Sequence, residues 1–334
     1  MLAGGDTLCE VFWNAVRKHG GRPAQEWFED GAWKSRTYAQ YGAAVRDVAH
    51  GLLAQGVKKG DRVAVWSKNL PQWGEVDFAN QTAGFVTVPV YDTLTGEKGA
   101  YILNDSDTKV LFVQDATILE RVLSVRSSLK TVKAIVLIQG RTTAAGVISY
   151  GEFIAQGRSF GAENPKKLDQ MAAKVESGDI ASLVYTSGTT GDPKGAVLTQ
   201  GNFATNSAAM DLVQVGPEDV FLSFLPLSHV FERTGGHFGA YRLGAKVVFA
   251  RSVDTLMDDM QTAKPTIMMS VPRLYEKMYS RMTDSVAKSS FVKRAIFNWA
   301  LGVGKAANVY RERNEPLPKG LAAKVHRADK LVFH

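Results

Sequence analysis

The chain has 334 residues, of which 45% are hydrophobic and 22% are charged, a composition typical of a folded protein rather than a disordered or fibrous one. Its single cysteine, Cys9, cannot form an internal disulfide, which excludes a secreted disulfide scaffold and favours a reducing, cytoplasmic location. The first ten residues carry Asp6 and Glu10 and lack an apolar run, so we expect no signal peptide. No run approaches the roughly 18 apolar residues that are needed to span a bilayer.

The formal net charge of +7 is unevenly distributed along the chain. Residues 277–334 contain twelve Lys or Arg and four Asp or Glu, so this segment carries a net charge of +8 and the remainder is close to neutral. A nucleic-acid-binding protein would be basic over its main body, so we expect no nucleic-acid partner. The basic segment suggests instead a peripheral contact with the anionic inner face of a membrane.

Short apolar runs rich in β-branched residues alternate with segments of helical periodicity. In chain order we expect helices at 8–18 and 38–55, a strand at 62–67, a helix at 70–82, strands at 85–90, 110–113, 134–138 and 182–186, a helix at 202–212, strands at 220–225 and 246–250, a helix at 253–262, a strand at 266–271 and a helix at 273–286. This alternation predicts an α/β fold with mostly parallel sheets that helices cover on both faces. The polar loop at 157–167 suggests a boundary between two halves, 1–165 and 166–334.

A further helix is expected at 289–305. On a helical wheel Phe291, Ile296, Trp299 and Val303 share one side, and basic residues lie mainly on the other. An apolar and basic helix of this kind fits an anionic membrane surface. The alternative interpretation is a helix whose apolar side packs on protein.

The most informative stretch is the segment that follows the strand at 182–186. It reads Thr186-Ser187-Gly188-Thr189-Thr190-Gly191-Asp192-Pro193-Lys194-Gly195. Glycines allow backbone N–H groups to approach an anion closely, and the hydroxyl groups add further donors. Pro193 favours a turn that presents the positive charge of Lys194. The pattern therefore predicts a polyphosphate-binding loop.

Other phosphate-binding and catalytic motifs do not fit this chain. A Walker A loop needs lysine directly after glycine and followed by Ser or Thr, whereas Asp192 and Pro193 separate Gly191 from Lys194 here. The dinucleotide-binding pattern G-x-G-x-x-G and the esterase pattern G-x-S-x-G are also absent from the sequence.

Residues 185–195 resemble the phosphate-binding signature of the adenylate-forming (AMP-binding) superfamily. The resemblance continues through residues 196–202, with Gln200 where the family usually has histidine. Residues 60–73 resemble an early segment of the superfamily. Three stretches resemble the long-chain acyl-CoA synthetase form in particular: Val88-Pro89-Val90-Tyr91-Asp92-Thr93-Leu94, Phe224-Leu225-Pro226-Leu227-Ser228-His229-Val230-Phe231-Glu232-Arg233 and Val271-Pro272-Arg273-Leu274-Tyr275-Glu276-Lys277.

The resemblance implies a two-step reaction. A long-chain fatty carboxylate attacks the α-phosphorus of ATP to give acyl-AMP and pyrophosphate, and the thiol of coenzyme A then attacks the acyl carbonyl. It assigns Thr186 to Mg²⁺ and phosphate, Ser187, Gly188, Thr189, Thr190 and Gly191 to the β- and γ-phosphates, and Lys194 to a supporting phosphate contact. It places His229 beside the nucleotide and the acyl carboxylate, where the imidazole would donate to anionic oxygen. Such a site works mainly by positioning and charge neutralisation.

Three further groups of residues near these motifs are candidates for a role in the site. His229, Glu232 and His237 lie close in sequence, but their spacing matches no standard zinc pattern. Arg273 follows an expected strand end and could reach a cleft, although an ion pair with Glu276 is the favoured interpretation. Proximity to His229 makes Val230, Phe231 and Phe238 candidates for the acyl pocket.

Several parts of the superfamily pattern are missing from this sequence. We find no glycine-rich adenine motif, no Tyr-Gly-x-Thr-Glu motif, no ribose-binding aspartate segment and no mobile C-terminal domain with its lysine. The hypothesis is a truncated N-terminal AMP-binding domain over residues 1–334, which alone binds ATP weakly and makes no acyl-CoA. The alternatives are another adenylate-forming ligase, acting on an aryl or short acid or on an acyl-carrier acceptor, and a catalytically inactive fragment that binds nucleotide or lipid.

Overall fold

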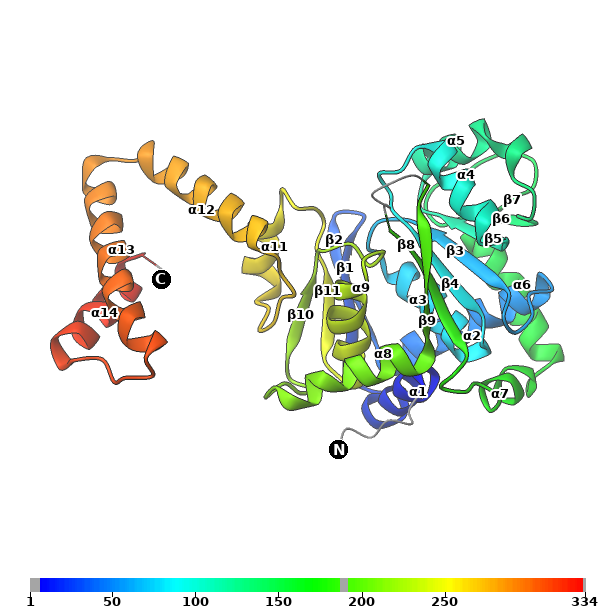
Figure 1. Ribbon diagram of the computed structural model, residues 1–334, viewed down its shortest axis with the longest axis horizontal. Helices are drawn as coiled ribbons and strands as arrows, with labels where there is room; N and C mark the ends of the chain where they lie inside the picture. Colours follow the sequence, from blue (N-terminus) through cyan, green and yellow to red (C-terminus); the bar gives the residue numbers. More distant parts are fainter. Residues whose placement is uncertain (1–6, 187–191, 333–334) are drawn as a thin grey trace. The chain divides into compact units, whose positions relative to one another are not determined.

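The computed structural model describes residues 7–186 and 192–332 of the chain (Figure 1). It divides into two compact units, Met1–Met269 and Ser270–His334. Residues 157–163, which the sequence suggests as part of a polar loop, instead belong to helix α6 (Tyr150–Glu163), and strands that follow them complete a sheet begun before them.

A seven-stranded sheet forms the larger part of the first unit, in the order β7-β6-β5-β3-β4-β8-β9. Its strands are β3 (Arg62–Trp66), β4 (Val86–Val90), β5 (Thr108–Val113), β6 (Ala134–Leu137), β7 (Val147–Ser149), β8 (Ile180–Thr186) and β9 (Lys194–Thr199). The pairs are parallel except for β8 and β9, which form an antiparallel hairpin at one edge. The expected mostly parallel α/β architecture is confirmed.

A smaller sheet of four strands has the order β10-β11-β1-β2. Its strands are β1 (Pro23–Glu29), β2 (Ala32–Thr37), β10 (Val220–Ser223) and β11 (Lys246–Phe249). The strands β10, β11 and β1 are mutually parallel, and β2 is antiparallel to β1. The first strands of the chain thus join the last ones, so the two sheets are interleaved in sequence.

Helices of the first unit cover both faces of the larger sheet. The helices of the first unit are α1 (Leu8–His19), α2 (Tyr38–Ala54), α3 (Pro71–Ala83), α4 (Gly96–Asp105), α5 (Ala116–Ser124), α6 (Tyr150–Glu163), α7 (Lys167–Ala172), α8 (Gln200–Ser207), α9 (Val230–Glu232), α10 (Ala240–Arg242) and α11 (Leu256–Ala263), with short 3₁₀ turns η1 (Arg126–Ser128) and η2 (Ala208–Leu212) and a π-helical segment η3 (Arg233–Gly239).

Strand β3 shows how the core is divided. Val63 and Val65 pack with α1, α2 and α3 on one face, and Ala64 and Trp66 pack with α4 and α5 on the other. All four side chains are fully buried, which explains why this strand reads as a continuous apolar run.

Most expected elements are present within a few residues of their expected bounds. The exception is the expected strand at 266–271, where Ile267 forms only an isolated parallel bridge to Phe221. The N–H groups of Thr266 and Ile267 both donate to the carbonyl of Val220, and helix α12 begins at Pro272, so the pairing with β10 does not continue as a regular strand.

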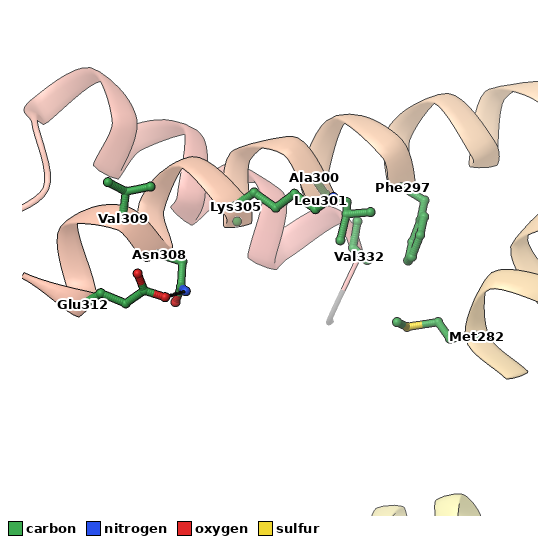
Figure 2. Close-up of a pocket in the computed structure, with 10 residues that line it drawn as sticks. Met282, Phe297, Ala300, Leu301, Lys305, Asn308, Val309, Glu312 and Val332 are labelled. Atoms are coloured by element: carbon green, nitrogen blue, oxygen red, sulfur yellow. Dashed lines mark hydrogen bonds between the residues drawn. The ribbon is translucent and has the colours of Figure 1, made fainter. Parts of the chain in front are cut away.

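The second unit consists of three helices, α12 (Pro272–Ala287), α13 (Phe291–Glu312) and α14 (Lys319–Val332). Ala300 and Val303 of α13 pack against Ala328 of α14 in a small apolar cluster. Beside it lies an apolar groove of about 520 Å³, whose lining includes Phe297, Leu301 and Met282 (Figure 2). The packing of α13 on α14 supports the interpretation in which part of its apolar side contacts protein.

Within residues 7–186 and 192–332, no helix combines the length and the apolar character that crossing a membrane requires.

Candidate functional site

The hairpin of β8 and β9 carries the predicted phosphate loop at its open end. Thr186 is the last residue of β8, and it pairs directly with Lys194, the first residue of β9. Both side chains are exposed, so their hydroxyl and ammonium groups are accessible to a ligand. The other predicted loop residues, Ser187, Gly188, Thr189, Thr190 and Gly191, lie outside the described residues.

A cavity of about 790 Å³ opens beside this hairpin. Thr186 and His229 both line it, although they are 43 positions apart in the sequence. Asp192 and Pro193, at the start of the returning strand, line it as well. Lys194 is not among the lining residues. The structure therefore brings together two of the predicted site residues and leaves Lys194 at the edge of the site.

The remaining wall of this cavity comes from β4, β8 and α4. The lining side chains from these elements and the turn that follows β4 are Pro89, Tyr91, Leu94, Glu97, Lys98, Tyr101, Ile102, Val184 and Tyr185, and Val230 completes the wall. The cavity therefore lies at the carboxyl ends of the parallel strands β4 and β8, the edge at which open α/β sheets usually bind ligands.

His229 occupies the N-cap position of the short helix α9. Its Nδ1 accepts a hydrogen bond from the backbone N–H of Phe231 at 3.2 Å. In the neutral imidazole, Nδ1 is then the acceptor and Nε2 carries the proton. The ring thus has an N–H donor remaining for a ligand, which is the role that the sequence predicts.

Asn69 holds the loop that leads to His229. Its Nδ2 donates to the carbonyl of Leu225 at 2.7 Å and to the Ser223 hydroxyl at 3.0 Å, and its Oδ1 accepts from the N–H of Leu227 at 2.8 Å. The Ser228 hydroxyl donates to the carbonyl of Val90, at the end of β4, at 3.4 Å. The position of His229 is therefore fixed by several contacts to the larger sheet and the start of α3.

Tyr185 forms part of the cavity wall next to Thr186. Its hydroxyl donates to Oδ2 of Asp105 at 2.6 Å. Burial and the hydrogen bond to Asp105 raise the pKa of Tyr185, so the phenol stays protonated at neutral pH. Gly195 lies opposite, and a Cβ atom there would lie 3.0 Å from Cζ of the tyrosine ring. The last glycine of the motif, Gly195, therefore makes room for Tyr185, a role that the sequence alone did not indicate.

The described residues give Mg²⁺ few protein ligands. No cluster of three or more His, Cys, Asp or Glu side chains that could hold a metal occurs in the described parts of the chain. The hydroxyl of Thr186 and the carboxylate of Asp192 both line the cavity, and both are oxygen donors of the type that Mg²⁺ prefers. This set suits an ion that keeps several waters and is bound mainly by substrate phosphates. Asp192 was not among the predicted ligands.

The zinc alternative is not supported by the positions of the three residues considered for it. His229 is exposed, whereas Glu232 and His237 are buried. Burial lowers the pKa of His237 to about 4, so its imidazole is neutral. Burial also raises the pKa of the Glu232 carboxyl to about 8.

A mostly apolar groove of about 430 Å³ lies on the other side of α9. Val230 lines both this groove and the first cavity, and Phe231 lines the groove. Phe238 does not line it. Its ring is fully buried and packs against Phe203 with centroids 5.1 Å apart, so it belongs to the core.

Arg273 is exposed at the first turn of α12, in the second unit, as is Glu276.

A family model described as AMP-binding enzyme matches residues 12–325, so the chain belongs to this family. The resemblance of the loop segment to the AMP-binding superfamily is thereby confirmed.

Curated relatives carry long-chain acyl-CoA synthetase names. The chain is 35% identical to "Long chain acyl-CoA synthetase 7, peroxisomal" of Arabidopsis thaliana, over 91% of this chain and 42% of that protein. It is 33% identical to the long-chain-fatty-acid–CoA ligase FadD15 of Mycobacterium tuberculosis, over 78% of this chain and 42% of that protein. The chain therefore spans less than half the length of these relatives.

Solved structures share the fold. An anthranilate CoA ligase, AuaEII, in complex with anthranoyl-AMP gives a TM-score of 0.70 at 23% identity, covering 81% of this chain and 51% of that one. A putative long-chain-fatty-acid CoA ligase from Rhodopseudomonas palustris gives 0.67 at 24% identity, covering 83% and 66%. These similarities confirm the expected fold of an adenylate-forming ligase.

Proposed function

We propose that this chain forms the phosphate-binding and carboxylate-binding part of a long-chain fatty acid–CoA ligase. The ligase would use MgATP to convert a fatty acid into acyl-AMP and would then transfer the acyl group to coenzyme A. The observation that carries the proposal is the position of Thr186 and His229 on one cavity at the end of the β8–β9 hairpin.

The chemistry of this cavity supports adenylation. The Thr186 hydroxyl, the Asp192 carboxylate and Mg²⁺ carried by ATP would hold the triphosphate, with Lys194 at the edge of the loop adding a positive charge. The Nε2–H of His229 would donate to an oxygen of the reacting carboxylate or α-phosphate. These groups align and neutralise two anionic reactants, which is the main requirement of this step.

The apolar groove along Phe231 supports a long acyl chain as substrate. It adjoins the cavity through Val230, so a carboxylate held near His229 would have its alkyl chain directed along apolar side chains. Each buried methylene contributes about 0.8 kcal/mol, so a groove of this kind favours long chains over short ones. The names of the curated relatives support the same substrate class.

The basic second unit supports peripheral contact with an anionic membrane. Residues 277–334 carry a net charge of +8, and Phe291, Trp299 and Leu331 are exposed there. Fatty acids partition into membranes, so such a contact would place the ligase near its substrate.

Binding by the chain itself tests the proposal. Calorimetry would compare MgATP, AMP and dodecyl-AMP, a stable ester that imitates acyl-AMP. We expect weak binding of MgATP and at least tenfold tighter binding of dodecyl-AMP than of AMP. We also expect no fatty-acid-dependent ATP–pyrophosphate exchange, because adenine, ribose and second metal contacts expected of the family are missing from this sequence.

Binding of short-chain and aromatic esters of AMP distinguishes the proposed function from the alternative functions. Tighter binding of benzyl-AMP or butyl-AMP than of dodecyl-AMP would favour a ligase for aryl or short acids. Equal affinity for every ester and for AMP would favour a fragment that binds nucleotide only. No binding of any of these ligands would contradict the proposal.

A further inference from the structure

A fully buried ion pair connects α3 with the segment that follows His229. Arg233, the first residue of η3, donates from Nε to Oδ2 of Asp77 at 2.9 Å and from Nη2 to Oδ1 at 2.5 Å. The two side chains are 1% and 0% exposed. Although burial acts to raise the pKa of the Asp77 carboxyl, the guanidinium of Arg233 holds that pKa below its usual value, so the pair is ionic.

The same guanidinium reaches the strand that ends at Thr186. Nη1 of Arg233 donates to the hydroxyl of Ser182 in β8 at 2.7 Å. The Ser182 hydroxyl in turn donates to the carbonyl of Thr87 in β4 at 2.7 Å. Ser182 is four residues before Thr186 on a regular strand, so the contact fixes the strand that carries the proposed phosphate ligand.

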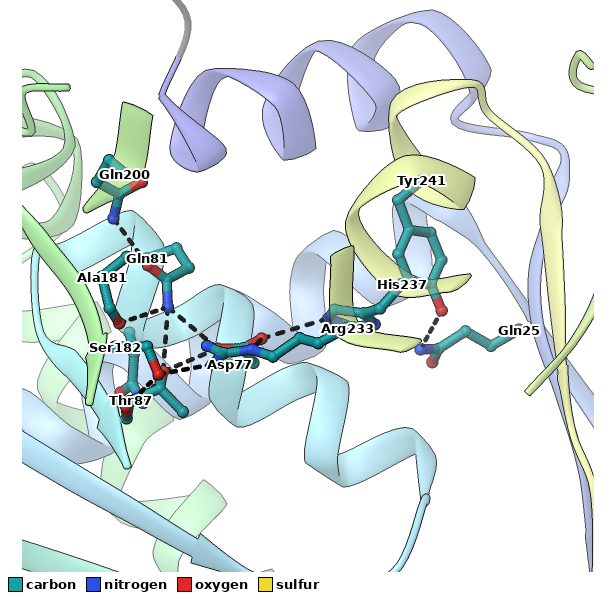
Figure 3. Close-up of polar contacts among 11 residues, drawn as sticks. Gln25, Asp77, Gln81, Thr87, Ala181, Ser182, Gln200, Arg233, His237 and Tyr241 are labelled. Atoms are coloured by element: carbon teal, nitrogen blue, oxygen red, sulfur yellow. Dashed lines mark hydrogen bonds and ion pairs between the residues drawn. The ribbon is translucent and has the colours of Figure 1, made fainter. Parts of the chain in front are cut away.

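A second branch of the network holds the returning strand of the hairpin. Gln81 donates from Nε2 to Oδ1 of Asp77 at 3.0 Å. Its Oε1 accepts from Nε2 of Gln200 at 2.8 Å, and Gln200 directly follows the end of β9 (Figure 3). Both strands of the hairpin are therefore bonded to the network around Asp77.

The backbone of Arg233 completes the connection to the other side of the cavity. Its N–H donates to the carbonyl of His229 at 3.1 Å. One residue thus bonds His229 through its main chain and β8 through its side chain. We propose that Arg233 is a positioning residue that fixes His229 relative to the phosphate-binding hairpin; this inference rests on the proposed function of the cavity.

An arginine at position 233 is better explained by a positioning role than by a contribution to the stability of the fold alone. A buried ion pair is often no more stabilising than well-packed apolar side chains of similar volume. The planar guanidinium instead directs donors to fixed points, here both carboxylate oxygens of Asp77 and the hydroxyl of Ser182. A lysine at this position would keep the charge but could not span the same three acceptors.

Removing Arg233 would leave Asp77 buried and unpaired and could unfold the protein, so the test uses Ser182→Ala. This change leaves the ion pair in place and removes the acceptor that links it to β8. The matched control is Ser207→Ala, since the Ser207 hydroxyl is also buried and donates to the carbonyl of Ala204 at 2.9 Å within its own helix. Hydrogen–deuterium exchange would be measured on both variants and on Arg233→Lys.

For Ser182→Ala and Arg233→Lys we expect amide exchange to rise about tenfold in two segments together, residues 180–199 and 229–233, with a several-fold loss of MgATP affinity. For Ser207→Ala we expect no selective increase of amide exchange in either of these two segments. An increase confined to β8, or the same increase in Ser207→Ala, would overturn the positioning role. If the unsubstituted chain does not bind MgATP, the proposed function fails, while the paired exchange response still decides the positioning role.

Discussion

Thr186 pairs directly with Lys194 across the open end of the β8–β9 hairpin. A hydroxyl group and an ammonium group therefore stand at the two ends of the loop that the sequence assigns to polyphosphate. Because both side chains are exposed, each can be substituted separately to measure its contribution to nucleotide binding.

Lys194→Met should lower the affinity for MgATP about tenfold, because a charge-assisted contact to phosphate is lost. Lys194 is exposed, so the melting temperature should hardly change. Calorimetric titration of Lys194→Met and of the charge-preserving Lys194→Arg would measure the effect. Equal affinity in the original chain and in Lys194→Met would contradict a role in phosphate binding.

Phe231→Ser should weaken binding of dodecyl-AMP several-fold and leave binding of MgATP unchanged. The Phe231 side chain is 43% exposed and lines the apolar groove, so its loss removes contact with an alkyl chain rather than with phosphate. The matched control is Phe28→Ser, since Phe28 is 37% exposed on β1 and does not line this groove. A parallel loss of both ligands in Phe231→Ser would show that the groove does not hold the acyl chain.

Gly195→Ala should destabilise the chain by about 1 kcal/mol, although alanine in a strand is normally better than glycine. The new Cβ atom would lie 3.0 Å from Cζ of the Tyr185 ring, which the bond to Asp105 holds in place. Urea unfolding would measure the change. In a Tyr185→Ala background the same substitution should become neutral or stabilising, and an unchanged penalty there would exclude the ring as its cause.

Glu232 predicts an unusual dependence of stability on pH. Its carboxyl is buried, and burial raises its pKa from 4.5 to about 8, against the smaller opposing effect of a hydrogen bond to Ser223. The folded state therefore binds a proton more tightly than the unfolded state. Stability is fully present below pH 4.5 and is lost as pH rises toward 8, by an amount on the order of 5 kcal/mol.

The best window for this measurement is pH 6.5 to 8. Below pH 6.5, His237 changes stability in the opposite direction to Glu232. Burial lowers the pKa of His237 to about 4, so the unfolded state binds a proton more tightly than the folded state, and stability falls as the pH falls. Urea unfolding of Glu232→Gln should show little of the decline seen in the unsubstituted chain between pH 6.5 and 8. An equally steep decline in the variant would assign the pH dependence to other groups.

Membrane contact predicts binding that depends on lipid charge. We expect the chain to co-sediment with phosphatidylglycerol vesicles and not with phosphatidylcholine vesicles, and Lys293→Glu with Arg294→Glu should reduce the bound fraction. Both residues are exposed, so we expect the two substitutions to leave the fold intact. An equal bound fraction on phosphatidylglycerol and phosphatidylcholine vesicles would contradict an electrostatic contact.

The sequence predicts those parts of the fold that depend on local pattern. β3 was predictable because both of its faces are buried and every position from Val63 to Trp66 is apolar. β1 and β2 were not, because they are only partly buried and contain charged residues such as Glu26 and Lys34. Their strand conformation depends on the pairing of β1 with β2 and with β11, which lies more than 200 residues later in the chain.

The candidate site likewise contains residues that a local sequence pattern indicates and residues that depend on distant contacts. Local sequence stretches, through their resemblance to the family, predict Thr186, Lys194 and His229 as site residues. Arg233 lies within a segment that the resemblance identifies, but its partners Asp77 and Ser182 are 156 and 51 positions away, so no local pattern indicates the network. The role of Gly195 likewise depends on the ring of Tyr185 across the hairpin.

The position of bound nucleotide tests the central claim most directly. Mn²⁺ can replace Mg²⁺ in the complex with ATP, and its paramagnetism broadens nearby amide signals in NMR spectra of the chain. If the triphosphate binds in the cavity beside the β8–β9 hairpin, Mn²⁺ should selectively broaden the amide signals of Thr186, Asp192, Lys194 and His229. Broadening centred elsewhere, with these four signals unaffected, would contradict it.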